Sequence, residues 1–147
     1  MDRGLTYLLL PFALLAVSGC SAKYDYIAET KVSETVVRVG LKHSHPYLAE
    51  YKKFLETEYA GTSKKIEIFP DSGGYAWVAL IAKHGALEIR DFGGLQDTIP
   101  LGQKADAAKK YLGRFDFDRS NRNRIYRFIP ASEDPHEPVD LSDHLNR

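Results

Sequence analysis

The sequence predicts an α+β fold that is mainly an antiparallel β-sheet of hairpins, with one short helix. Several segments alternate apolar and polar residues with a period of two, which buries one face of a strand. The connections between these segments are short, whereas parallel pairs would need longer crossovers. A single segment, residues 103–112, combines good helix-forming residues with a glycine just after its end, which is typical of a short helix.

The predicted elements follow from this alternation and from the glycines and prolines that interrupt it. The first strand alternates Val37, Val39 and Leu41 with basic residues, and the segment 74–82 is apolar enough for the centre of a sheet. In chain order the elements are strands at 35–42, 64–69, 74–82 and 86–92, an edge piece at 98–101, the helix at 103–112 and a last strand at 124–129.

One segment, residues 47–59, is ambiguous. Its apolar residues fall on a helical stripe, while three of them also share one face of a strand. The turn at 60–63 joins it to the alternating segment 64–69, and this setting suits a hairpin. We favour a strand slightly and leave the helix open.

Length and composition limit the classes of protein to consider. The chain has 147 residues, 44% of them apolar, which suits one small domain and is too apolar for a disordered chain. Its 20 basic side chains balance 20 acidic ones, so bulk electrostatics predicts no nucleic-acid partner. No apolar run reaches the roughly 20 residues of a membrane-spanning helix. The single cysteine excludes an internal disulfide.

The first 19 residues have the layout of a secretory signal peptide. A short charged start precedes the apolar stretch Leu5–Val17, and small residues follow it. This stretch is too short for a permanent membrane span, and we expect a helix if it is present. The four residues Val17-Ser18-Gly19-Cys20 resemble the lipobox of bacterial lipoproteins. The alternatives are an ordinary signal peptide or an N-terminal anchor that happens to contain a cysteine.

The lipoprotein resemblance implies cleavage after Gly19 and attachment of lipid, including palmitate-like acyl chains, to Cys20. Ser21 stands where an aspartate would retain the protein in the inner membrane, which implies the outer membrane with the domain facing the periplasm. We expect no cofactor other than this lipid. The predicted organisation is a signal peptide at 1–19, a lipidated tether at 20–33, a β-rich domain at 34–130 and an acidic, proline-containing tail at 131–147.

Two Asp-x-Gly-Gly segments, which begin at Asp71 and Asp91, are candidates for chemistry. Two aspartates on similar turns could form a carboxylate pair for acid–base catalysis or bind a hard cation. The structural alternative is that the glycines supply the turn conformation and each aspartate accepts hydrogen bonds from turn amides. We favour the turn interpretation, because nothing in the sequence shows that the two carboxylates meet.

His43 and His45 lie on the same side of the first strand if that strand continues, and could supply half of a zinc or copper site. A third ligand would have to come from His84, Glu50 or an aspartate elsewhere, and no spacing indicates one. We favour two exposed polar histidines, and therefore predict no metal.

Residues 116–120 resemble the first ligand positions of a calcium loop. However, Arg127 stands where the closing glutamate is required, which favours a polar turn. The segment 104–127 also carries eight basic residues against three acidic ones, followed by an acidic tail. We predict that the two segments pair with each other or stay solvated, rather than bind an anionic ligand.

Known catalytic motifs such as a Gly-x-Ser-x-Gly elbow or a His-Glu-x-x-His pair do not occur, so an enzyme is the less favoured class. The sequence predicts a membrane-anchored envelope lipoprotein with a small non-catalytic binding domain, which acts as an accessory, inhibitor or immunity-type protein on an envelope partner. The alternatives are a metal or small-ligand binder that uses His43 and His45, and a small envelope hydrolase that uses Asp71 and Asp91.

Overall fold

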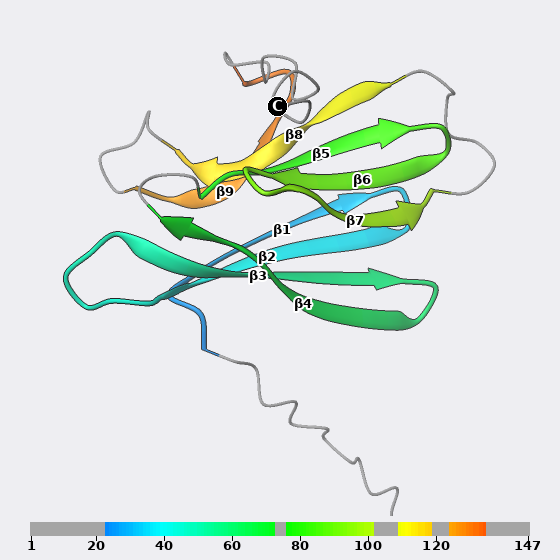
Figure 1. The fold of residues 1–147 in the computed structure, drawn as a ribbon. Helices are drawn as coiled ribbons and strands as arrows, with labels where there is room; N and C mark the ends of the chain where they lie inside the picture. Colours follow the sequence, from blue (N-terminus) through cyan, green and yellow to red (C-terminus); the bar gives the residue numbers. More distant parts are fainter. Residues whose placement is uncertain (1–22, 73–75, 102–108, 119–123, 135–147) are drawn as a thin grey trace, which may run out of the picture.

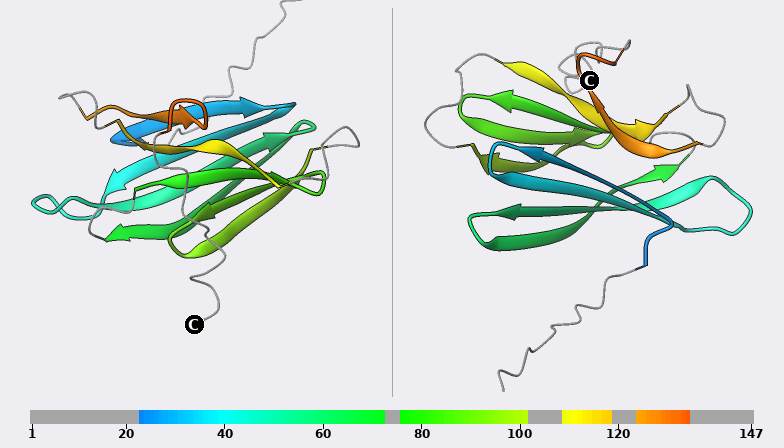
Figure 2. Two further views of the ribbon diagram at one scale, coloured as in Figure 1. Left: turned by 90° about the horizontal axis from the view of Figure 1, so that it is seen from above. Right: turned by 180° about the vertical axis from the view of Figure 1, so that it is seen from behind.

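The protein is a sandwich of two antiparallel β-sheets (Figures 1 and 2). The computed structural model describes residues 23–72, 76–101, 109–118 and 124–134. The first sheet has the strand order β1-β2-β3-β4 and the second has the order β7-β6-β5-β8-β9. The strands are β1 Tyr26–Val32, β2 Thr35–His43, β3 Glu50–Tyr59, β4 Thr62–Ser72, β5 Val78–Lys83, β6 Ala86–Asp91, β7 Gly94–Pro100, β8 Lys110–Phe117 and β9 Tyr126–Pro130. The prediction of a mainly antiparallel sheet is confirmed.

Tight turns connect the hairpins where the sequence predicts them. The β3–β4 turn at Ala60 and Gly61 has φ values of 50° and 75°, and the β5–β6 turn at His84 and Gly85 has 49° and 76°. Two consecutive residues with positive φ are typical of the two-residue turn that matches the twist of a hairpin, and glycine adopts this conformation without strain.

The ambiguous segment 47–59 is a strand from Glu50 on. β3 pairs with β2 on one side and with β4 on the other, so it is central in its sheet. Tyr51, Lys53 and Leu55 alternate on its buried face, while Phe54 and Glu56 lie on the outer face. The slight preference for a strand is confirmed, since two neighbouring strands satisfy its backbone groups.

The core lies between the two sheets and takes apolar side chains from both. The predicted strand at 35–42 corresponds to β2, and the apolar segment 74–82 contains β5, which lies between β6 and β8 in its sheet. The central core side chains are at most 1% exposed; they are Val37, Val39, Leu41, Leu55, Val78, Leu80, Leu87, Ile89 and Phe115. Burial of such a side chain contributes about 1.5–3 kcal/mol.

The predicted helix at 103–112 is wrong in its last part. Residues 110–112 begin β8, which pairs with β5 and β9, and residues 102–108 lie outside the described residues. Gly113 does not cap a helix; it lies within β8 beside a bulge and has a φ of 138°. The described parts of the chain contain no helix, and hence none long and apolar enough to cross a membrane.

The folded domain begins earlier than the sequence predicts. Residues 26–32, assigned above to a tether, form β1 and pair with β2 along their whole length. Just before this strand, Tyr24 packs on the outer face of the first sheet and donates a hydrogen bond to Glu56 Oε1 at 2.6 Å. Alternation is weak here, because β1 is an edge strand with Ile27 exposed and Ala28 inside.

The two sheets are joined along both edges. β1 lies beside β9 on one side (Figure 2), and on the other side Lys64 Nζ of β4 lies 2.8 Å from Asp97 Oδ1 of β7. The predicted edge piece at 98–101 is the end of the longer edge strand β7. The predicted strand at 124–129 corresponds to β9, with Tyr126 facing the core.

Candidate functional site

A fully buried ion pair joins the two sheets inside the core. Lys53 of β3 and Asp91 at the end of β6 face each other, with Nζ 3.1 Å from Oδ2 and both side chains inaccessible to solvent. Burying two charges costs several kcal/mol per ion unless the geometry and further hydrogen bonds compensate. We call Lys53, Asp91, Asp71 and Tyr126 the buried polar cluster.

The turn after β6 holds the Asp91 carboxylate. Asp91 Oδ1 accepts hydrogen bonds from the Gly93 backbone N–H at 2.8 Å and from Gln96 Nε2 at 2.9 Å. Gln96 is the extra residue of a bulge in β7, which turns its side chain toward the aspartate. The interpretation of this Asp-x-Gly-Gly segment as a turn is therefore confirmed for Asp91, which in addition pairs with Lys53.

A second bulge brings Asp71 to the same side of the first sheet. Lys53 pairs with Ile68 but Tyr51 pairs with Asp71, so β4 has an extra residue near Pro70. Strict alternation from Ile68 would bury residue 70, whereas the bulge buries Asp71, which is 3% exposed. Residues 73–75 of this segment lie outside the described residues.

The electrostatics of the cluster reflect its burial. Burial lowers the pKa of the Lys53 ammonium, and the negative charges of Asp91, Asp71 and Asp116 oppose that shift in part. Burial also raises the pKa of the Tyr126 hydroxyl, as do the neighbouring carboxylates, and this hydroxyl donates a hydrogen bond to the Ala76 carbonyl at 2.9 Å. The hydroxyl thus stays protonated in the core.

The structure places the two predicted aspartates in one cluster, and it adds two residues that sequence reasoning missed. Asp71 and Asp91 are 3% and 2% exposed, so neither offers a carboxylate to a substrate in solution. The signal for Lys53 was present in the sequence: it occupies an inward position between Tyr51 and Leu55 in the strand interpretation of 47–59. A lysine at such a position requires a buried partner.

The two candidate histidines have separate partners. His43 ends β2, packs against the Tyr51 ring at 4.5 Å and places Nδ1 3.1 Å from Asp25 Oδ2. Hydrogen bonding from His43 lowers the pKa of Asp25. His45 Nδ1 instead accepts a hydrogen bond from the Tyr47 backbone N–H at 3.2 Å.

A third metal ligand does not join these histidines in the described residues. Within those residues, no three His, Cys, Asp or Glu side chains are arranged to hold a metal ion. Glu50 begins β3, and His84 lies in the β5–β6 turn of the other sheet.

The residues that resemble a calcium loop form a strand end. Asp116 and Phe117 belong to β8, and Asp118 accepts a hydrogen bond from Arg127 Nε at 2.9 Å. This pairing directs the Asp118 carboxylate to β9. Residues 119–123 lie outside the described residues.

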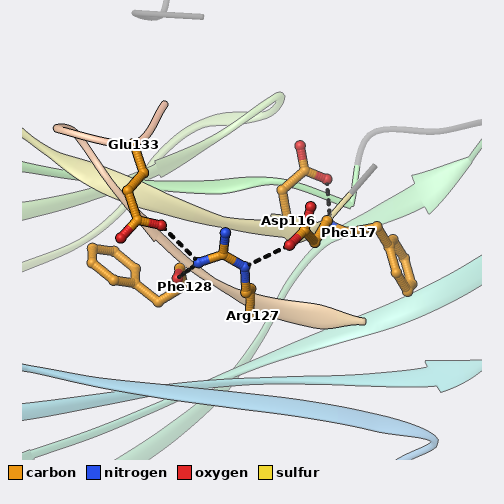
Figure 3. A network of polar contacts seen from close by, with 6 residues as sticks. Asp116, Phe117, Arg127, Phe128 and Glu133 are labelled. Carbon is orange, nitrogen blue, oxygen red and sulfur yellow. Dashed lines mark hydrogen bonds and ion pairs between the residues drawn. The ribbon is translucent and has the colours of Figure 1, made fainter. Parts of the chain in front are cut away.

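Charge pairing between the basic segment and the start of the acidic tail is confirmed. Arg127 Nη1 lies 3.1 Å from Glu133 Oε2 (Figure 3). Asp134 accepts a hydrogen bond from the Tyr111 hydroxyl at 2.7 Å and lies 3.3 Å from Arg114 Nε. These contacts fold residues 131–134 back toward the second sheet. The tail beyond them, 135–147, lies outside the described residues.

Three exposed apolar side chains lie where β4 meets the β6–β7 hairpin, and we call them the apolar patch. Phe69, Phe92 and Leu95 are 39%, 54% and 51% exposed. The Phe69 and Phe92 rings are 5.9 Å apart although they come from different sheets. A Cβ atom at Gly93 would lie 2.8 Å from the Phe69 side chain, so the glycine permits this close approach. Asp91, one residue before Phe92, points to the core from the same turn.

Comparisons of the chain with protein-family models, with curated proteins and with solved structures found no match.

Proposed function

We propose that this protein is a bacterial envelope lipoprotein, anchored in the outer membrane and facing the periplasm, whose β-sandwich binds another envelope protein. The observation that carries the binding role is the apolar patch. Its two phenylalanines contact each other across the sheets but remain 39% and 54% exposed. Exposed aromatic side chains that are already ordered lose little conformational entropy on binding, and aromatic residues are enriched at interface centres.

The surroundings of the patch suit a protein partner. The patch adjoins β4 and β7, both edge strands of their sheets. The ion pair between Lys64 and Asp97 joins the same two strands and supplies polar side chains near the patch. An apolar centre with polar side chains around it is typical of protein–protein interfaces.

The lipid anchor would hold this domain near the bilayer. Only three residues separate Cys20 from Tyr24, so the Cα atoms of these two residues lie at most about 14 Å apart whatever the conformation between them. Tyr24 is fixed on the outer face of the first sheet by Glu56, and Lys65 Nζ lies 4.8 Å from its ring centre. A partner of the patch would therefore also lie close to the membrane surface.

A photoreactive phenylalanine derivative in place of Phe92 should cross-link one defined protein in intact cells. The matched control is the same group in place of Ile27, which is also 54% exposed but lies on β1, at the edge of the first sheet opposite β4. With the probe at Phe92, the substitution Leu95→Ser should lower the cross-linking yield about tenfold, because it removes an apolar side chain that the partner would bury. Cross-linking that is equal from both probe positions, or absent from Phe92, would contradict the proposed interface.

The anchor is tested independently of the patch. Cells fed a labelled fatty acid should label the unmodified chain and the control variant Ser21→Ala, and leave Cys20→Ser unlabelled and released from the membrane. Ser21→Asp should keep the label and move the protein to the inner membrane. Label on Cys20→Ser would refute the lipoprotein assignment.

A further inference from the structure

We propose that Lys53 and Asp91 condense into an intramolecular amide bond, which the folded protein forms by itself and which joins the two sheets covalently. The bond would connect the side-chain nitrogen of β3 to the side-chain carboxyl carbon at the end of β6. It requires no cofactor, metal or oxidant, and its only by-product is water.

The geometry of the ion pair suits this reaction. Lys53 Nζ lies 3.1 Å from Asp91 Oδ2 and approaches from the opposite sheet, so the core holds the two reacting groups together. The nitrogen attacks the carboxyl carbon that carries Oδ2, and groups held together in this way gain the large rate advantage of an intramolecular reaction. Both side chains are fully buried, so bulk water has no access to the amine and the carboxylate, or to the amide that they form.

The other carboxylate oxygen already has the donors that the reaction needs. Asp91 Oδ1 accepts hydrogen bonds from the Gly93 N–H and from Gln96 Nε2. When nitrogen attacks the carboxyl carbon, negative charge develops on this oxygen, and two fixed donors stabilise it in the manner of an oxyanion hole. Oδ1 then remains as the amide oxygen, and Oδ2, which faces the lysine, leaves.

The atoms and charges balance. The ammonium gives one proton to Oδ2, which produces a neutral amine and a neutral carboxylic acid. The amine attacks the carboxyl carbon, a second nitrogen proton passes to Oδ2, and Oδ2 departs as water while the C–N bond stays. An ammonium and a carboxylate thus become an amide and one water molecule, and two buried charges disappear.

Two further observations support the proton transfers. Burial lowers the pKa of the Lys53 ammonium, which favours the neutral, nucleophilic amine. The bulge in β4 places Asp71, a second buried carboxylate, opposite Tyr51 on the buried face that also carries Lys53. We assign to Asp71 the relay of the second proton from nitrogen to the leaving oxygen, a general acid–base role.

Tryptic digestion of the denatured full-length chain, purified from membranes, decides whether the bond exists. The amide blocks cleavage after Lys53, so residues 53–64 should be recovered joined to residues 91–104, lighter than the sum of the two peptides by one water molecule. If the digest contains the separate peptides 54–64 and 91–104 and no branched product, Lys53 and Asp91 form only an ion pair. That result would overturn the proposal. This readout needs no substitution and therefore does not depend on any variant folding.

The variant Asp71→Asn tests the relay. It should slow formation of the branched peptide about 100-fold after synthesis, as expected for loss of a general acid–base group. The matched control Asp97→Asn alters an acidic residue outside the cluster and should form the bond at the normal rate. Equal rates in the two variants would overturn the role of Asp71. Circular dichroism checks that both variants are folded.

Discussion

Replacing Asp91 by alanine should lower the free energy of unfolding by at least about 3–5 kcal/mol, because it leaves the Lys53 amine in the core with neither an ionic partner nor an amide bond. The alanine also removes the acceptor for Gly93 and Gln96 in the β6–β7 turn. Urea unfolding followed by tryptophan fluorescence measures the loss, since the chain has a single tryptophan.

Two control variants distinguish the effect of burial on stability from the effect of charge pairing. Asp97→Ala breaks the ion pair with Lys64, a side chain that is 53% exposed, and should reduce stability by less than about 1 kcal/mol. The double variant Lys53→Met with Asp91→Leu leaves no unpaired charge in the core and should be more stable than Asp91→Ala. An equal decrease in the free energy of unfolding for Asp91→Ala and Asp97→Ala would show that the buried pair contributes no more to stability than the exposed pair.

Gly113→Ala should destabilise the protein by about 2–4 kcal/mol, because the position combines an unfavourable backbone conformation with a steric clash. Its φ is 138°, and an added Cβ would lie 2.3 Å from the Ile129 carbonyl oxygen of the neighbouring strand β9. The added Cβ would also lie 2.7 Å from Phe128 Cζ and 2.8 Å from the backbone atom Pro130 Cα, so movement of the Phe128 side chain would not relieve the clash with the backbone.

Gly61→Ala is the matched control for this substitution. Gly61 also has a positive φ, of 75°, but an added Cβ there meets nothing within 4 Å. This substitution should therefore show the backbone effect alone, about 1 kcal/mol. Thermal unfolding of both variants measures the difference in their stability. An equal loss of stability would mean that the added Cβ at Gly113 causes no steric clash with β9.

The hairpins could be predicted because their signals are local. Apolar and polar residues alternate within each strand, and the left-handed turns fall at Ala60-Gly61 and His84-Gly85, where the glycine is visible in the sequence. The helix prediction failed at residues 110–112 for a physical reason. Helix propensity is worth only a few tenths of a kcal/mol per residue. Lys110 and Tyr111 instead pair with β5, and the Leu112 carbonyl accepts a hydrogen bond from the Ala131 N–H.

The buried polar cluster, unlike the hairpins, depends on contacts between residues that are far apart in the sequence. Asp71 and Asp91 could be selected from their repeated Asp-x-Gly-Gly pattern, and the turn role of Asp91 could be stated from sequence. Their shared buried environment could not be predicted from the sequence. It depends on how the two sheets stack and on a bulge that shifts the alternation of β4 by one residue. Lys53 was overlooked for the same reason, since its partner lies 38 positions away in the other sheet.

By itself, the sequence determined that this protein is built from antiparallel hairpins and that its basic segment has an acidic partner next to it in the chain. Both features depend on neighbours in sequence, so local patterns reveal them. Only the tertiary structure decided that Lys53 and Asp91 meet in a dry core, and that Phe69 and Phe92 form one exposed patch. These contacts join residues of different sheets, and stacking of the sheets, which depends on the whole core, brings them together.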